Sequence, residues 1–123
     1  MSSPVLDKFG GLITQEMRDK ALDFFEDAVQ DKLRAPSLRG FQDELASLSD
    51  QQLALVRRAV MLSLDHGIHD FLFALVKSHD SEQGIEVRVD GLNIVELSDG
   101  LHGEPWTREG WIARLGRYPE SNE

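Results

Sequence analysis

Asp65, His66, His69 and Asp70 form the densest group of side chains in this sequence that could ligate a metal ion. Histidines three residues apart share a face when the chain is helical, and imidazole together with carboxylate suits zinc, iron or manganese. This group supports the hypothesis of a metal-binding protein or a metal-dependent hydrolase centred on His66 and His69.

The same four residues also have a purely structural interpretation. Asp65 and His66 would stand near the end of one helix, and His69 or Asp70 would satisfy open backbone donors at the start of the next. His69 would then be a buried, hydrogen-bonded histidine. The His69-Asp70 doublet resembles the one in metal-dependent phosphohydrolases of the HD type, but the distant second histidine and aspartate of those enzymes are not identified here. We therefore assign neither a metal nor a cofactor.

A second candidate site is an acidic stripe on the first expected helix. Helical spacing places its members together, opposite the face that carries Phe24 and Phe25. Such a stripe either is a solvated face or docks a basic protein partner, as in inhibitors that block a basic active site. The residues of the stripe are Glu16, Asp19, Asp23, Glu26 and Asp27.

Two helices are expected in the first part of the chain. The first should begin at Thr14, a residue type that caps helix N-termini, and end before Ala35-Pro36, because proline disfavours a helical residue before it. A shorter helical pattern follows between Leu38 and Leu48.

A third helix should begin at Ser49, which with Gln52 has the spacing of a capping box. Apolar residues point nearly all round its axis between Leu53 and Leu64, a pattern typical of a helix buried between layers. We therefore expect this helix at the centre of the fold. Gly67 should end or kink it, and a further helical stretch should finish near Ser78-His79-Asp80.

After Gly84 the apolar period changes from 3.6 to 2, which indicates strands. Asp90-Gly91 is a strong signal for a two-residue hairpin turn, and it would place Val89 opposite Leu92. The last element is ambiguous. Residues 111–115 alternate as in a third strand, which we favour, but they also fit a short helix capped by Thr107.

Residues 67–75 (GIHDFLFAL), the hairpin and residues 110–119 (GWIARLGRYP) together resemble a family of small uncharacterised bacterial proteins, in which helices come first and a short β-meander last. The resemblance implies a bacterial source and a final strand at Trp111–Leu115. It implies no catalytic or binding residue.

Composition restricts the class of protein. The 123 residues are 41% hydrophobic and 28% charged, as in an ordinary globular domain, and no cysteine is present. The absence of cysteine fits a reducing compartment, and no secretory signal is visible, so we expect a cytoplasmic protein. A net charge of −9 disfavours binding to nucleic acid or to an anionic membrane and favours solubility or a basic partner. We expect no membrane span.

We therefore predict one α+β domain over residues 1–123, with about four helices followed by a three-stranded antiparallel meander and with residues 1–12 and 119–123 loosely ordered. The predicted function is that of a non-enzymatic bacterial protein-interaction domain, of the immunity or antitoxin kind, that uses its acidic surface. The alternative is the metal protein centred on His66 and His69.

Overall fold

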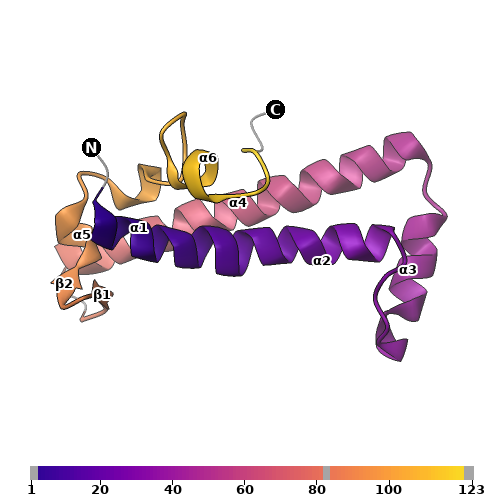
Figure 1. The fold of residues 1–123 in the computed structure, drawn as a ribbon, viewed down its shortest axis with the longest axis horizontal. Coiled ribbons are helices and arrows are strands. Elements are labelled where there is room, and N and C mark those ends of the chain that lie inside the picture. Colours follow the sequence, from indigo (N-terminus) through magenta and orange to yellow (C-terminus); the bar gives the residue numbers. More distant parts are fainter. Residues whose placement is uncertain (1–2, 82–83, 121–123) are drawn as a thin grey trace.

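A computed structural model describes residues 3–81 and 84–120 of the chain. Two long helical rods run antiparallel to one another (Figure 1). The first rod is continuous and consists of α1 (Pro4–Gly11), the π-helix η1 (Leu12–Asp19) and α2 (Lys20–Val29). The second rod is α4 (Asp50–Asp80).

The first rod begins earlier than the sequence predicted. Ser3 is its N-cap, and the side-chain oxygen of Ser3 accepts a hydrogen bond from the backbone N–H of Leu6 at 3.3 Å. Thr14, the predicted cap, lies inside the rod and is buried. Within residues 1–12, for which loose order was predicted, Leu6 and Phe9 are buried in the core and anchor α1. Met1 and Ser2 lie outside the described residues.

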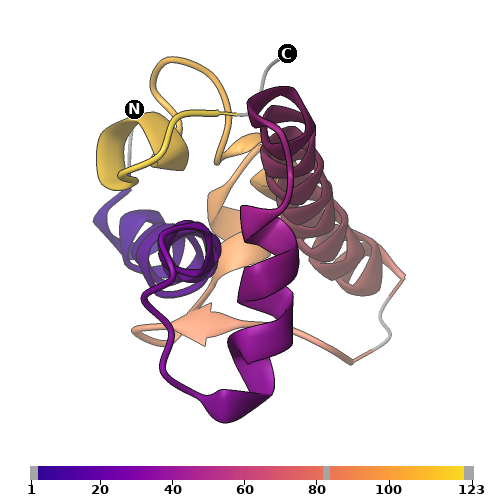
Figure 2. The same cartoon turned by 90° about the vertical axis from the view of Figure 1, so that its right-hand side faces the viewer.

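The connection between the rods contains η2 (Pro36–Leu38) and α3 (Arg39–Ala46), which confirms the second predicted helix. Figure 2 shows α3 lying across the ends of both rods. Leu45 of α3 packs with Phe25 and Ala28 of α2 in a small separate core.

The predicted capping box at the start of α4 is confirmed. The Ser49 backbone N–H donates to the side chain of Gln52 at 2.9 Å, and the Gln52 backbone N–H donates to Ser49 Oγ at 3.1 Å. Gly67 does not end this helix. The two predicted helical stretches form one helix of 31 residues.

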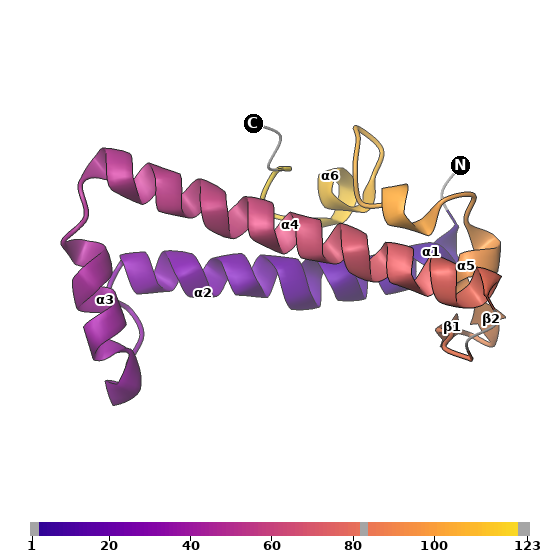
Figure 3. The same ribbon diagram turned by 180° about the vertical axis from the view of Figure 1, so that it is seen from behind.

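The prediction that the Leu53–Leu64 segment lies at the centre of the fold is wrong. Leu55 is 64% exposed and Leu62 is 42% exposed. In Figure 3, no described helix or strand is drawn in front of α4.

The predicted hairpin is confirmed. Strands β1 (Arg88–Val89) and β2 (Leu92–Asn93) are antiparallel, with Val89 opposite Leu92. Asp90 and Gly91 have φ angles of 54° and 81°, as a type I′ turn requires.

A third strand is not formed within the described residues, and the prediction of a strand at Trp111–Leu115 is wrong. This segment is the short helix α6 (Trp111–Leu115), which begins after Gly110 and not after Thr107. Trp111 is fully buried, and its ring meets that of Phe9 edge-on at 6.0 Å. Burial of the indole against α1, with the turn at Gly110, decides the conformation of this segment.

The main core lies between the first rod, the C-terminal half of α4 and the segments α5 (Ile94–Leu97), η3 (Leu101–Gly103) and α6. The α+β class is thus confirmed, but the predicted numbers of helices and strands are wrong. The buried apolar residues of this core are Leu6, Phe9, Ile13, Ile68, Leu72, Leu75, Ile94, Leu101 and Trp111.

Candidate functional site

Arg18 of η1 is fully buried and lies at the centre of a polar cluster. Its Nε and Nη2 atoms donate to the two carboxylate oxygens of Asp65 at 2.6 and 3.1 Å. Nη1 donates to the carbonyl oxygen of Tyr118 at 2.8 Å, and Nη2 also donates to that of Pro119 at 2.7 Å. Arg18 therefore joins η1, α4 and the C-terminal segment. Asp65, one of the predicted metal ligands, uses both of its carboxylate oxygens in the ion pair with Arg18. Loose order was predicted for residues 119–123. Pro119 accepts a hydrogen bond from Arg18, and residues 121–123 lie outside the described part of the chain.

The other predicted metal ligands lie at the surface of α4. Nε2 of His66 is 3.3 Å from Asp70 Oδ2, and Nδ1 of His69 is 3.2 Å from Asp70 Oδ1. With Asp65, the two histidines line a hollow of about 240 Å³ that Trp106 and Glu120 also reach. Within residues 3–81 and 84–120, no three His, Asp or Glu side chains are grouped closely enough to hold a metal ion. The geometry therefore gives the metal hypothesis no support.

The predicted acidic stripe does not form one free surface. Asp19 is buried, and both of its carboxylate oxygens accept from the backbone N–H of Arg117 at 3.1 Å. Asp23 and Glu26 pair with Arg117 and Arg57, respectively. The remaining two residues are Glu16, which pairs with Lys20, and Asp27, which is half-buried. All five residues lie along the first rod, Glu16 and Asp19 in η1 and the other three in α2. Their helical spacing could not show that Arg117 and Arg57, from distant segments, engage Asp19, Asp23 and Glu26.

Asp23 is the electrostatic centre of this contact. Hydrogen bonds from Arg117 and from the Tyr118 hydroxyl, the latter at 2.7 Å, lower the pKa of the Asp23 carboxyl. Desolvation, with the hydrogen bond to Asp23, raises the pKa of Tyr118. The Asp23 side chain therefore fixes the C-terminal segment to the first rod.

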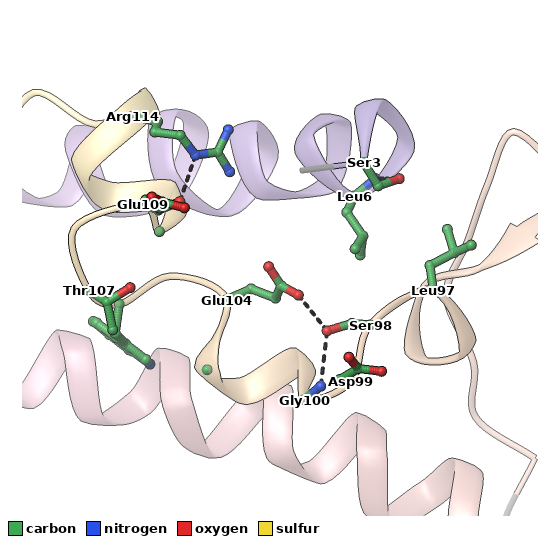
Figure 4. Close-up of a pocket in the computed structure, with 13 residues that line it drawn as sticks. Ser3, Leu6, Leu97, Ser98, Asp99, Gly100, Glu104, Thr107, Glu109 and Arg114 are labelled. Carbon is green, nitrogen blue, oxygen red and sulfur yellow. Dashed lines mark hydrogen bonds between the residues drawn. The ribbon is translucent and has the colours of Figure 1, made fainter. Parts of the chain in front are cut away.

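A larger hollow of about 580 Å³ lies between α1, the loop from α5 to η3, and the loop that leads into α6 (Figure 4). This volume is in the range of about 300–1,000 Å³ that is typical of ligand pockets. Its apolar lining comes from Leu6, Leu97 and Trp106. The indole N–H of Trp106 donates to the carbonyl oxygen of His102 at 2.8 Å, which fixes the ring in place.

The polar lining of this hollow, which we call the acidic hollow, contains Asp99, Glu104 and Glu109. Ser98 Oγ donates to Glu104 Oε2 at 2.5 Å and accepts from the backbone N–H of Gly100 at 3.2 Å. Figure 4 shows the Glu104 carboxylate directed into the hollow. Its second oxygen, Oε1, has no hydrogen-bond partner within the described part of the chain.

Among the described residues that line the hollow, Arg114 is the only cationic side chain, and its charge is already paired. Nη1 and Nη2 donate to the two Asp7 carboxylate oxygens at 3.0 and 2.9 Å, and Nε donates to the carbonyl oxygen of Glu109 at 2.7 Å. The hydrogen bonds to Asp7, and the nearby charges of Asp7, Glu104 and Glu109, raise the pKa of Arg114. The hollow therefore keeps a net negative charge, which suits a cation.

Thr107 lies on the rim of the acidic hollow in a strained conformation. Its φ is 79°, an uncommon value for a β-branched residue. The Thr107 backbone N–H donates to Glu120 Oε2 at 2.8 Å, which holds the turn. No functional role was predicted for residues 98–105, so the acidic hollow was missed. The only indication of the acidic hollow in the sequence is the close spacing of Asp99, Glu104 and Glu109.

Comparison with known proteins adds no identification, since no protein-family model, curated protein or solved structure matches this chain. The resemblance to a bacterial family therefore stays a prediction. Among the helices of the described residues, α4 alone is long and apolar enough to cross a membrane by length and composition, and 22% of its most apolar 18-residue window is buried. An apolar helix of a soluble protein meets the same criterion, and the prediction of no membrane partner is left untested.

Proposed function

We propose that this chain is a non-enzymatic protein-interaction domain that binds a basic segment of a partner protein in the acidic hollow. The observation that carries the proposal is the Glu104 carboxylate. Ser98 orients it through one oxygen, while the other oxygen faces the hollow without a partner in the described residues. A charged donor placed there would form a charge-assisted hydrogen bond, which is among the stronger polar contacts in proteins.

The remaining lining residues favour a lysine or arginine side chain over a small metal cation. Leu6 and Leu97 offer apolar surface for the methylene stem, and the Trp106 ring offers a face for a cation–π contact. Asp99 and Glu109 add negative charge at the same hollow. The net charge of −9 would also speed encounter with a basic partner.

This proposal moves the docking surface away from the stripe on the first rod. Asp19 and Asp23 contact Arg117, and Glu26 contacts Arg57, so these three acidic residues stabilise the fold. Neutralisation of a basic toxin is one concrete form of such a function, and we propose the bacterial cytosol as its location.

Capture of partners from a bacterial extract at low and at high salt tests this proposal. The bait with Asp99→Asn, Glu104→Gln and Glu109→Gln should lose a basic protein that the wild type retains at low salt. A matched bait with Glu16→Gln, Asp27→Asn and Glu44→Gln changes the net charge equally and should retain it. Retention by the first variant and loss by the second would contradict the proposal.

A further inference from the structure

One wall of the acidic hollow is a loop of residues 106–110, which we call the rim loop. Trp106, Thr107 and Glu109 of this loop are among the residues that line the hollow. Figure 4 shows Thr107 and Glu109 across the hollow from Leu97. The position of the rim loop therefore decides where one aromatic ring and one carboxylate of the hollow lie.

The base of the rim loop is held by two backbone hydrogen bonds. The backbone N–H of Trp111 donates to the carbonyl oxygen of Glu104 at 2.9 Å, and that of Ile112 donates to the carbonyl oxygen of Pro105 at 3.1 Å. Both bonds lie where the loop leaves and rejoins the rest of the fold. They do not hold its tip, residues 107–109.

The tip depends on contacts with side chains. Thr107 is a β-branched residue at a φ of 79°, and such a residue keeps this conformation only where the surrounding contacts impose it. The Thr107 carbonyl oxygen accepts from the Gly110 N–H at 3.1 Å, and the Thr107 N–H donates to Glu120 Oε2 at 2.8 Å. Arg114 Nε holds the other end of the tip through the carbonyl oxygen of Glu109 at 2.7 Å.

Glu120 is held in place by contacts of the two residues before it. The buried Arg18 donates to the carbonyl oxygens of Tyr118 and Pro119 at 2.8 and 2.7 Å. The Tyr118 hydroxyl also donates to Asp23 Oδ1 at 2.7 Å. The backbone next to Glu120 is thus already fixed to the first rod, so its side chain loses less conformational freedom on reaching the rim loop than that of an unanchored glutamate.

We propose that Glu120 is a positioning residue of the acidic hollow. By holding the Thr107 N–H, it keeps the tip of the rim loop, and with it the Glu109 carboxylate, at the place where a basic side chain binds. Among the described residues, Glu120 lines the smaller hollow beside Trp106 and not the acidic hollow, so it acts through Thr107. This inference rests on the proposed function.

Binding of a short oligo-arginine peptide separates positioning from charge. Glu120→Ala removes the charge and the acceptor and should weaken binding about fivefold, the effect of one typical hydrogen bond. Glu120→Gln removes only the charge, keeps an acceptor oxygen and should bind within about twofold of the wild type.

Thr107→Gly provides the rescue, because glycine adopts a positive φ without strain. In this background, Glu120→Ala should weaken binding by less than about twofold. Equal losses for Glu120→Ala and Glu120→Gln, or the full loss in the Thr107→Gly background, would overturn the inference.

Solvent exchange of the Thr107 amide, followed by NMR, tests the same contact without a ligand. Exchange reports local opening, so the rate in Glu120→Ala should rise about fivefold or more. The Trp111 amide, bonded at the base of the loop, serves as the control for an intact fold and should not change. An unchanged Thr107 rate would overturn the inference even where the peptide binds. A wild type that binds no peptide would contradict the proposed function, and the Thr107 exchange would still decide whether Glu120 positions the rim loop.

Discussion

Arg18 and Asp65 form a bidentate ion pair between η1 and α4, at N···O distances of 2.6 and 3.1 Å. Arg18 is fully buried, and Asp65 is 7% exposed. The remaining donors of the guanidinium hold the carbonyl oxygens of Tyr118 and Pro119. One buried cation thus joins three segments that are far apart in the sequence.

Asp65→Asn should be strongly destabilising, because it leaves the buried Arg18 charge without its counter-ion. Breaking a buried pair in this way costs about 3–5 kcal/mol. Glu16→Gln removes the exposed pair with Lys20 and should change the free energy of unfolding by less than about 0.5 kcal/mol. Urea unfolding measures the free energy of unfolding of both variants. A similarly small change for the two variants would contradict the role of the Arg18–Asp65 ion pair in joining η1, α4 and the C-terminal segment.

The pKa of Asp23 gives a prediction about acid stability. Hydrogen bonds from Arg117 and Tyr118 lower this pKa in the folded state, so the unfolded chain takes up the proton first as the pH falls. The contribution of Asp23 is therefore present above its ordinary pKa of about 3.9 and is lost as the pH falls through the folded value.

Tyr118→Phe removes one of the two hydrogen-bond donors to Asp23 and should raise the Asp23 pKa towards its ordinary value. Carboxyl carbon NMR titration measures this directly. Asp27→Asn, on the same helix, serves as the control and should leave the Asp23 titration unchanged. An Asp23 that titrates at its ordinary value in the wild type would show that the contact with Tyr118 and Arg117 is not formed.

Gly91→Val should destabilise the hairpin much more than Asp90→Asn. Gly91 has a φ of 81°, where a β-branched residue is strained by about 1–3 kcal/mol. Asparagine tolerates positive φ, so Asp90→Asn should cost less than about 0.5 kcal/mol. Equal shifts of the denaturant midpoint for the two variants would contradict the type I′ turn.

Gly110→Ala should be destabilising because of close packing. A Cβ atom at this position would lie 2.2 Å from the Trp106 carbonyl oxygen and 2.6 Å from Pro105, and backbone atoms there cannot move aside cheaply. Overpacking of this kind costs about 1–3 kcal/mol. Gly103→Ala meets no atom within 4 Å and serves as the control. A Gly110→Ala protein as stable as the control would show that α6 is not seated as described.

Local signals in the sequence predicted local structure well. The capping box at Ser49 and the turn at Asp90-Gly91 are both formed, because a few adjacent residues determine each of them. The prediction of a helix boundary at Gly67 is wrong, because α4 continues through this residue. Gly67 lies in an uncrowded part of a helix that tertiary packing holds together, so its intrinsic cost does not break α4.

Contacts between distant segments could not be predicted in this way. The alternation at Trp111–Leu115 resembled a strand, yet the burial of Trp111 against Phe9 makes the segment helical. Similarly, Arg117 comes from about a hundred residues away to engage Asp19 and Asp23. A helical pattern shows which acidic residues share a face, but it cannot show which of them the rest of the chain neutralises.

NMR titration with a short oligo-arginine peptide tests the central claim, binding of a basic segment in the acidic hollow, most directly. Amide shift changes should concentrate at residues 98–100 and 106–110. Glu104→Gln should weaken binding about tenfold or more, because it removes a hydrogen bond to a charged group, while Glu16→Gln should leave the affinity unchanged. Equal affinity for the wild type and Glu104→Gln, or shift changes confined to α2, would contradict the account.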